Sequence, residues 1–318
     1  MNKQFSIFLE RKRRKWSRRF LVLLCFPLLI ALTVAACNSG STNNANEAIK
    51  VGSKDFTEQF ILGEMYALAL ENSGFKVERK LNLGGTPVAQ ASLKSGAIDL
   101  YPEYTGTGLL TVLKLPADNN RQQVYKTVAK EYQEKFSLVW LQPAPMNNTQ
   151  ALVMTQKGAQ KYKIKTISDL LAKANQLVMI GPPEFEARED GLVGLKKVYG
   201  DFNLKKFIPA DPGLRYQALN QGQADVAVAF GTDGEISAFN LVVLKDDKNL
   251  FPPYQVAPVV RQDALNAHAK IRQVLNALAP KLTDRTMREL NYEVSGKQRE
   301  PADVAKAFLK QAKLLKNP

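Results

Sequence analysis

Cysteine and histidine are almost missing from this chain of 318 residues, which has two cysteines and one histidine. Cys25 and Cys37 lie near the N-terminus, so the rest of the sequence has no thiol for a disulfide, a nucleophile or a metal ligand. His268 lies between two alanines in an expected helix, and no neighbouring residue supports acid–base catalysis through it. Stability must therefore come from an ordinary hydrophobic core, for which the chain is long enough.

Several ligand motifs are also missing. The sequence has neither the G-x-x-x-x-G-K-[ST] phosphate loop nor G-x-G-x-x-G, and the glycine-rich stretch 82–87, NLGGTP, is too short for either and indicates a turn near a ligand. No metal-ligand spacing occurs, and no basic stripe with interleaved aromatics indicates nucleic-acid binding. We expect no cofactor, no metal, no nucleic-acid partner and no enzymatic activity.

The N-terminus has the layout of an export signal. Residues 11–19 are basic, residues 20–36 are an apolar run, and small residues precede Cys37, as in a bacterial lipobox. We predict a lipoprotein signal peptide over 1–36, lipidation at Cys37 and a flexible Asn/Ser-rich tether over 37–48. An uncleaved membrane anchor is the alternative, because seventeen apolar residues lie at the lower limit for a spanning helix. Both place the protein at the periplasmic or extracytoplasmic face, and removal of 1–36, with eight Lys/Arg and one acid, lowers the net charge from +14 to +7.

Short strand-like runs alternate with helical ones from Ile49 onward. IKVGS at 49–53 reads as a strand and is followed by a helix that Asp55 or Thr57 could cap and that Gly74 ends. The same alternation returns in the second half, as in QLVMIGPP and GLVGLKKVYG. Strands separated by helices predict an α/β fold with largely parallel sheets.

Two stretches resemble each other within the chain. Residues 92–107, SLKSGAIDLYPEYTGT, and 218–233, ALNQGQADVAVAFGTD, share a helix end, a glycine, an aspartate, a strand and a turn. Either α/β units simply look alike, or the protein has two similar lobes that each present the same strand-end loop. Because ligands of open α/β sheets bind outside the carboxyl ends of strands, the second interpretation places Tyr104 and Phe230 on opposite walls of one cleft.

Proline-rich turns mark where the chain crosses between the lobes. They occur at 141–148, LQPAPMNN, and at 250–258, LFPPYQVAP, and the C-terminal helices are expected to return to the first lobe. We therefore predict that residues 49–148 and 255–318 form lobe 1 and residues 149–254 form lobe 2.

Six blocks of sequence, in order, resemble the substrate-binding lipoproteins of osmoprotectant ABC importers, which handle glycine betaine, choline, carnitine and proline betaine. The blocks are VGSKDFTEQFILGEM, GGTPVAQASLKSGAIDLYPEYTGTG, PAPMNNTQAL, GPPEFEAREDG, GLRYQAL and FPPYQVAPVVR. The resemblance implies a two-lobed class II periplasmic-binding-protein fold with the ligand in the cleft between the lobes. It also implies a monomer that is no enzyme and that delivers a zwitterionic or cationic solute to a membrane permease driven by an ATPase.

The resemblance assigns site residues to this sequence. A trimethylammonium group has no N–H to donate, so aromatic faces hold it by cation–π attraction. By resemblance, cage rings are expected at Tyr104, Phe230 and Tyr254, and contacts to a carboxylate tail at Lys54, Thr107 and Arg188. Two positions depart from the family: Gln150 stands where an aromatic is usual, and Asn148 where some members have an aspartate. These amides leave open a more polar betaine, such as ergothioneine.

Other roles for the same residues stay open. Tyr101 could face the core, Glu103 could be a solvated, permease-facing or ligand-binding acid, and Asp99 is expected to bind backbone N–H groups in its turn. Lys54 and Arg188 could instead form ion pairs with Asp55 or Glu186. A sensory ligand-binding module and an enzyme built on a binding fold are the alternative functions.

Overall fold

The computed structural model describes residues 47–211 and 213–315. The predicted signal peptide, the lipidation site Cys37 and most of the predicted tether lie outside these residues. Among the described residues, none of the helices is both long enough and apolar enough to cross a membrane.

The first sheet has five strands in the order β2-β1-β3-β10-β4. The pairs β1–β2 and β1–β3 are parallel, whereas β10 runs antiparallel to both β3 and β4. The strands of this sheet are β1 (Ile49–Gly52), β2 (Val77–Lys80), β3 (Leu100–Tyr104), β4 (Leu138–Trp140) and β10 (Val256–Arg261).

The second sheet repeats this arrangement in the order β7-β6-β8-β5-β9. The pairs β6–β7 and β6–β8 are parallel, and β5 runs antiparallel to β8 and β9. Position by position the two sheets have the same topology, as expected for two similar lobes. The strands are β5 (Gln150–Met154), β6 (Val178–Gly181), β7 (Lys206–Pro209), β8 (Val226–Phe230) and β9 (Val242–Val243).

The expectation of largely parallel sheets is wrong, because half of the strand pairings are antiparallel. The antiparallel partner is in each case the strand that follows a proline-rich segment, β5 after 141–149 and β10 after 244–255. A chain that arrives from the other lobe enters the sheet from its opposite end. The alternation of strands and helices gives no sign of this reversal.

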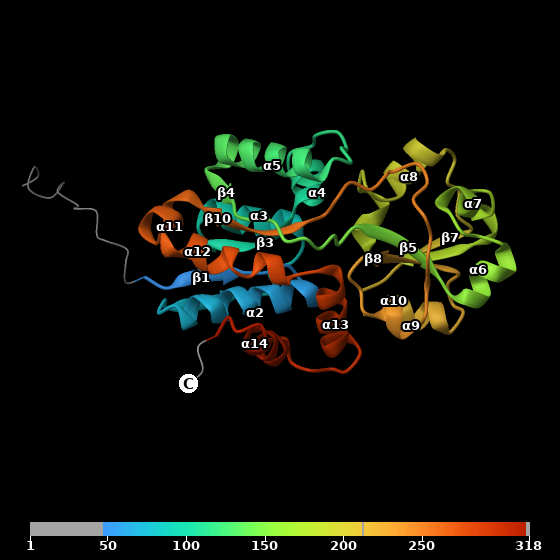
Figure 1. Cartoon of the computed structure of the whole chain (residues 1–318). Coiled ribbons are helices and arrows are strands. Elements are labelled where there is room, and N and C mark those ends of the chain that lie inside the picture. Colours follow the sequence, from blue (N-terminus) through green and yellow to red (C-terminus); the bar gives the residue numbers. More distant parts are fainter. Residues whose placement is uncertain (1–46, 212, 316–318) are drawn as a thin grey trace, which may run out of the picture. The chain divides into compact units, whose positions relative to one another are not determined.

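Helices cover both faces of the first sheet (Figure 1). On one face α2 packs against α12, α13 and α14, and on the other face α3 and α5 pack over Tyr101 and Trp140. The helices of this lobe are α2 (Thr57–Asn72), α3 (Thr86–Ser95), α4 (Thr105–Thr107), α5 (Arg121–Phe136), α11 (Gln262–Ala267), α12 (Lys270–Asn276), α13 (Asp284–Ser295) and α14 (Pro301–Gln311), with a short π-helix at Gly108–Val112 and a 3₁₀ turn at Ala279–Lys281.

The second sheet is covered in the same way (Figure 1). Leu152, Val226 and Val228 pack against the helices on one face, and Ala227 and Ala229 against those on the other. The helices are α6 (Gln156–Tyr162), α7 (Ile167–Leu171), α8 (Leu192–Tyr199), α9 (Arg215–Asn220) and α10 (Glu235–Ala238), with single turns at Ala174–Gln176 and Pro183–Glu186.

The start of α2 differs from its prediction. Phe56 is the N-cap residue and, in the described chain, no side chain caps this end, so neither Asp55 nor Thr57 has the expected role. The end agrees with the prediction, since Ser73 is the C-cap and Gly74 follows with φ of 92°, a conformation that glycine adopts without strain.

Strand β3 shows how the sequence divides its side chains between the two faces. Leu100 and Tyr104 belong to the core beneath α2, whereas Tyr101 points to the opposite core with Tyr132 and is fully buried. This is the alternation of a strand buried on both sides. The interpretation of Tyr101 as a core residue is therefore confirmed.

Two chain segments connect the sheets and lie side by side. Residues 141–149 lead from β4 to β5, and residues 244–255 lead from β9 back to β10. The N–H of Asn148 donates to the carbonyl of Tyr254 over 3.1 Å, and the N–H of Tyr254 donates to Oδ1 of Asn147 over 2.7 Å. The two proline-rich stretches therefore lie in the segments that connect the two sheets.

Candidate functional site

Glu58, in the first turn of α2, receives hydrogen bonds from both lobes. Its Oε1 accepts from Tyr104 Oη and Asn148 Nδ2, each over 2.8 Å. Its Oε2 accepts from Thr232 Oγ1 over 2.5 Å and from Asn291 Nδ2 over 2.8 Å. The donors come from β3, the first crossing segment, the loop after β8 and α13. One carboxylate therefore ties the carboxyl ends of strands from both sheets.

The charge of Glu58 is strongly affected by its surroundings. Burial raises the pKa of its carboxyl group, and hydrogen bonds from Thr232, Asn291 and Tyr104 oppose this shift without cancelling it. The position in the first turn of α2 favours negative charge, because the helix N-terminus carries partial positive charge. The site thus contains a desolvated acid held by neutral donors.

Three aromatic rings lie in a row beside Glu58. The Phe56 ring stands between Tyr104, at a centroid distance of 6.2 Å, and Phe230, at 6.4 Å, and both pairs are close to parallel. These distances fall within the range of aromatic contact. Tyr104 and Phe230 were expected in one cleft, and the structure brings both against the same third ring. Phe56 supplies an aromatic face that Gln150 does not.

A cation of the protein lies over each outer ring. Nζ of Lys54 is 5.2 Å from the centre of the Tyr104 ring, and Cζ of Arg215 is 5.0 Å from the centre of the Phe230 ring. Both distances are within the reach of cation–π attraction. The rings expected to bind a ligand's cation therefore already contact cations of the chain.

Lys54 is buried and paired with an acid of its own lobe. Its Nζ donates to Glu103 over 2.6 Å and to Thr86 Oγ1 over 3.1 Å, and burial lowers the pKa of the ammonium group. The alternative ion pair with Asp55 or Glu186 is wrong, because the partner is Glu103. Glu103 is fully buried, so the interpretations as a solvated or permease-facing acid are wrong as well.

Arg188 and Tyr254 meet at a different acid. Arg188 donates through Nε and Nη2 to the two oxygens of Asp190, over 2.7 and 2.6 Å, and Tyr254 Oη donates to the same carboxylate. An ion pair of Arg188 with Asp55 or Glu186 is therefore not formed in the structure. The ring of Tyr254 packs on Gly106, where a Cβ would lie 2.7 Å from ring carbons.

The remaining predicted contacts are also buried. Thr107 ends α4 and is 5% exposed, and Gln150 begins β5 opposite Phe230 in the strand register, at 4% exposure. Burial raises the pKa of Asp190, but hydrogen bonds and charge from Arg188, with smaller contributions from Tyr254 and Gln150, bring it below its usual value. Gln150 therefore belongs, with Arg188 and Tyr254, to the side chains that surround Asp190.

A small cavity of about 50 Å³ lies between the ring row and α9. Of the eight predicted ligand-binding residues, Asn148 and Phe230 line it. The sequence interpretation missed the others, although Phe56 and Glu58 belong to the quoted block VGSKDFTEQFILGEM and Arg215 to GLRYQAL. The lining residues are Phe56, Thr57, Glu58, Asn148, Gly213, Arg215, Tyr216, Phe230, Asp233, Glu235, Asn291 and Ser295.

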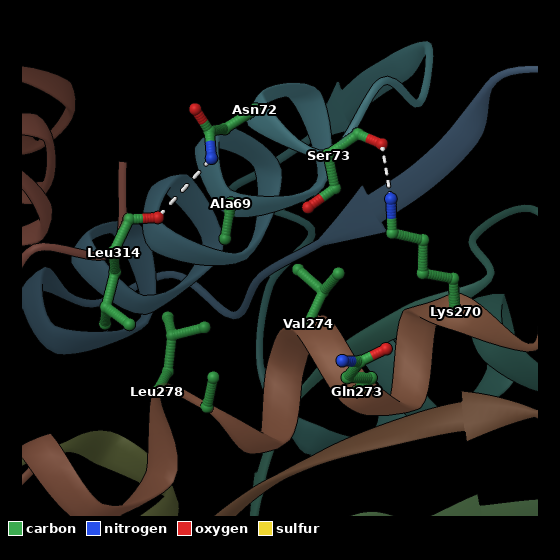
Figure 2. Close-up of a pocket in the computed structure, with 9 residues that line it drawn as sticks. Ala69, Asn72, Ser73, Lys270, Gln273, Val274, Leu278 and Leu314 are labelled. Atoms are coloured by element: carbon green, nitrogen blue, oxygen red, sulfur yellow. Dashed lines mark hydrogen bonds between the residues drawn. The ribbon is translucent and has the colours of Figure 1, made fainter. Parts of the chain in front are cut away.

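A larger cavity of about 300 Å³ lies between the end of α2 and α12 (Figure 2). Nζ of Lys270 donates to the carbonyl of Ser73 over 3.3 Å, and Nδ2 of Asn72 donates to the carbonyl of Leu314 over 3.5 Å. Val274 and Leu278 line it on the α12 side. It has neither an aromatic ring nor an acid in its lining, so its size alone does not make it the ligand site.

The described residues contain no group of three or more His, Cys, Asp or Glu side chains placed to hold a metal ion. The chemistry of the small cavity is instead that of recognition: rings, amides, the acids Glu58, Asp233 and Glu235, and one arginine, Arg215, which is paired with Asp233. These groups can bind a small charged molecule between the lobes.

Comparison with known proteins gives a matching family. Residues 47–311 match the substrate-binding domain of the ABC-type glycine betaine transport system. The glycine-betaine-binding protein of Pseudomonas aeruginosa is 36% identical over 279 residues, which cover 85% of this chain and 89% of that protein. A crystal structure of a glycine betaine/carnitine/choline ABC transporter has a TM-score of 0.70 at 33% identity, covering 84% of this chain and 99% of that chain.

The ergothioneine transport permease/ergothioneine binding protein EgtU of Helicobacter pylori is 33% identical over 306 residues. The match covers 96% of this chain and 55% of that protein, so the chain spans about half the length of this relative. The two-lobed α/β fold expected from the sequence is confirmed by these comparisons. The chain belongs to the family of substrate-binding domains of ABC-type glycine betaine transport systems.

Proposed function

We propose that this protein is the extracytoplasmic receptor of an ABC importer, that it binds a quaternary-ammonium osmoprotectant between its lobes, and that it hands this solute to the permease. The observation that carries the proposal is the row of Tyr104, Phe56 and Phe230 beside the buried carboxylate of Glu58. Ring faces and a nearby negative charge are what a cation without N–H groups requires.

Binding in this cleft requires the lobes to separate. The cavity of about 50 Å³ is far below the roughly 300 Å³ at the lower end of ligand pockets. Phe56 and Glu58 come from lobe 1, whereas Phe230 and Thr232 come from lobe 2, so separation of the lobes opens the site. The two crossing segments are the natural hinge, because they connect the sheets.

The candidate ligands follow from the family and from the ligands that name its members. Glycine betaine, carnitine and choline all carry a trimethylammonium group and are the first candidates. A polar betaine such as ergothioneine is the second candidate. It is favoured by Oδ1 of Asn148 and Oδ1 of Asn291, which are buried at the cavity without a hydrogen-bond partner among the described residues and could accept from ligand N–H groups.

We assign ligand contact to Tyr104, Asn148 and Phe230. Behind them, the other predicted site residues form a layer that holds the walls of the cleft, in which only Arg188 is partly exposed. These residues are Lys54, Thr107, Gln150, Arg188 and Tyr254, each with internal contacts or little exposure.

The anchoring and division of the chain are proposed from the sequence and the sheets. We place a signal peptide at 1–36, a lipid on Cys37, a tether at 37–48, lobe 1 at 49–148 and 255–318, and lobe 2 at 149–254. Support for the lobe boundaries is the distribution of strands, with β1–β4 and β10 in one sheet and β5–β9 in the other. The protein acts as a monomer at the outer face of the cell membrane.

Isothermal titration of residues 38–318 tests the ligand class. We expect dissociation constants below millimolar for at least one of glycine betaine, choline, carnitine, proline betaine and ergothioneine. A protein that binds none of the five contradicts the proposal. Metabolic labelling with a palmitate analogue tests the anchor, since labelling should be lost in Cys37→Ala and its persistence would exclude this site.

A further inference from the structure

The loop that follows β8 packs against α13. Nε of Arg288 donates to the carbonyl of Gly231 over 2.8 Å, and Nδ2 of Asn291 donates to the carbonyl of Thr232 over 2.8 Å. The loop follows a strand of the second sheet, whereas α13 follows β10 of the first sheet. These two hydrogen bonds therefore join lobe 1 to lobe 2.

Gly234 allows the loop and the helix to approach this closely. A Cβ at Gly234 would lie 2.5 Å from the Cβ of Tyr292, 2.8 Å from the backbone nitrogen of Tyr292 and 2.8 Å from the carbonyl oxygen of Arg288. The φ of −67° and ψ of −27° at Gly234 are open to any residue, so the backbone conformation does not require glycine here. The close approach of α13 does.

Most of this contact lies outside the small cavity. Asn291 lines the cavity, whereas Gly231, Gly234, Arg288 and Tyr292 do not. A ligand in the cavity therefore has no need to touch the residues of the outer contact. They hold the two lobes together through atoms of the protein alone.

Other contacts of α13 fix the helix to lobe 1 and to the first crossing segment. Met287 is fully buried in the core beneath α2. At the start of the helix, Oδ1 of Asp284 accepts from the N–H of Asn147 over 2.6 Å. The carbonyl of Leu282, just before the helix, accepts from the N–H of Met146 over 3.1 Å. Because α13 is bound to lobe 1 in this way, separation of the lobes draws the loop after β8 away from the helix.

We propose that α13 is a closure latch, whose contacts with residues 231–234 stabilise the closed arrangement of the lobes without touching the ligand. This inference goes beyond the proposed function and rests on it in one respect, that the lobes separate to admit a ligand. The apparent affinity of a ligand that is held between closed lobes depends on how favourable closure is. Loss of the latch should therefore weaken every ligand by the same factor.

Arg288→Met and Gly234→Ala disrupt the latch in two different ways. Methionine lacks the donor to Gly231, and its loss should weaken glycine betaine by about three- to tenfold, the effect of one hydrogen bond. Alanine fits the backbone conformation at Gly234 but overlaps atoms of α13, and should weaken glycine betaine by at least about fivefold. Calorimetric titration measures both. In each variant, every other compound of the five that binds should weaken by the same factor, within about twofold.

Arg285→Met is the matched control, because it makes the same substitution on the same helix. The side chain of Arg285 is 88% exposed and pairs with Glu289 of its own helix. Since an exposed pair contributes little, ligand affinity should stay within about twofold of wild type. Thermal melting of the three variants checks that they are folded.

A pair of labels measures closure directly. Residues 38–318 contain no cysteine, so Lys130→Cys in α5 and Lys157→Cys in α6 provide one labelling site in each lobe. Both lysines are exposed. Energy transfer between dyes at these sites should show a smaller closed fraction in Arg288→Met and Gly234→Ala than in the protein without these changes. The measurement is made without ligand and at one fixed concentration of glycine betaine.

The outcomes separate the latch from the proposed function. Folded variants that keep wild-type affinity overturn the latch, because the contact would then persist when the lobes separate. Weakening of one ligand alone overturns it too, as does an equal weakening in Arg285→Met. Wild-type protein that binds no quaternary-ammonium compound contradicts the proposed function instead. The ligand-free energy transfer then decides on the latch, and a closed fraction that is unchanged in the variants overturns it.

Discussion

Asp99 and Asp225 make the same contact in the two halves of the protein. Asp99 donates its N–H to the carbonyl of Lys50 over 2.8 Å, and its Oδ2 accepts from the N–H of Lys50 over 2.8 Å. Asp225 does the same with Val178, over 2.8 and 2.9 Å. Each aspartate therefore pins the start of β3 or β8 to the parallel strand beside it. The Asp99 side chain binds a backbone N–H, as expected, but this N–H belongs to β1 and not to the turn of Asp99.

Removal of either side chain should destabilise its lobe. In Asp99→Ala the N–H of Lys50 loses its acceptor, and in Asp225→Ala the N–H of Val178 does, at a cost of about 1–2 kcal/mol each. Urea unfolding of the two single variants and the double variant measures this. Because the sites are in different lobes, the two losses should add, and a double variant no less stable than either single variant would contradict the equivalence.

Tyr104 has two separable roles, one for its ring and one for its hydroxyl. Tyr104→Phe keeps the ring against Phe56 and removes the hydrogen bond to Glu58, so ligand affinity should change little while stability falls by about 1 kcal/mol. Tyr104→Ala removes the ring and should lower affinity by about threefold or more. Calorimetric titration measures the ligand affinity and thermal melting measures the stability. Full affinity in Tyr104→Ala would contradict the proposal that the Tyr104 ring contacts the ligand.

Stability should depend on pH through Glu58. Burial raises the pKa of this carboxyl group in the folded protein above the value of 4.5 of an unperturbed glutamate. The folded state therefore binds the proton more tightly, and the associated stability is complete below about pH 4.5 and is lost as the pH rises through the folded-state pKa. The Glu58→Gln variant has no carboxyl group at this position, so it lacks this dependence of stability on pH.

The melting temperatures of the wild-type and Glu58→Gln proteins between pH 4 and pH 8 provide the measurement. All other titrating groups are shared, so their contributions largely cancel in the difference between the two curves. The wild-type protein should lose stability relative to the variant as the pH rises. A difference that grows in favour of the wild-type protein over this range would mean that the four hydrogen bonds to Glu58 outweigh its burial.

Gly106 leaves no room for a side chain, because the ring of Tyr254 packs directly against it. A Cβ at Gly106 would lie 2.7 Å from carbons of Tyr254, so Gly106→Ala should displace that ring and cost about 1–3 kcal/mol of unfolding free energy. Gly213→Ala is the matched control for stability, since nothing lies within 4 Å of its added Cβ. Chemical denaturation of both variants measures the difference, and equal stability would show that the ring of Tyr254 moves aside freely.

Much of the fold could be predicted from the pattern of the chain. The alternation of IKVGS with the long helix, the resemblance of 92–107 to 218–233 and the two proline-rich crossings gave two similar α/β lobes. Periodicity carries this information because it reports which side chains are buried. It does not report strand direction, so the antiparallel entry of β5 and β10 was not foreseen.

The site was predicted less completely than the fold. Tyr104 and Phe230 were placed in one cleft because both follow strand ends, and the structure joins them through Phe56. The pairing of Lys54 with Glu103 and of Arg188 with Asp190 was not foreseen. Charged residues near each other in sequence gave plausible partners, but the true partner is decided by which side chains share a buried space.

The sequence by itself determined the family and the two-lobed α/β fold, since these depend on local periodicity and on motifs in order. Only the tertiary structure decided which charged groups are paired and which share a cavity. Glu58 and Arg215 are 157 positions apart in the chain and line one cavity. Desolvation and hydrogen-bond satisfaction depend on every neighbour in three dimensions.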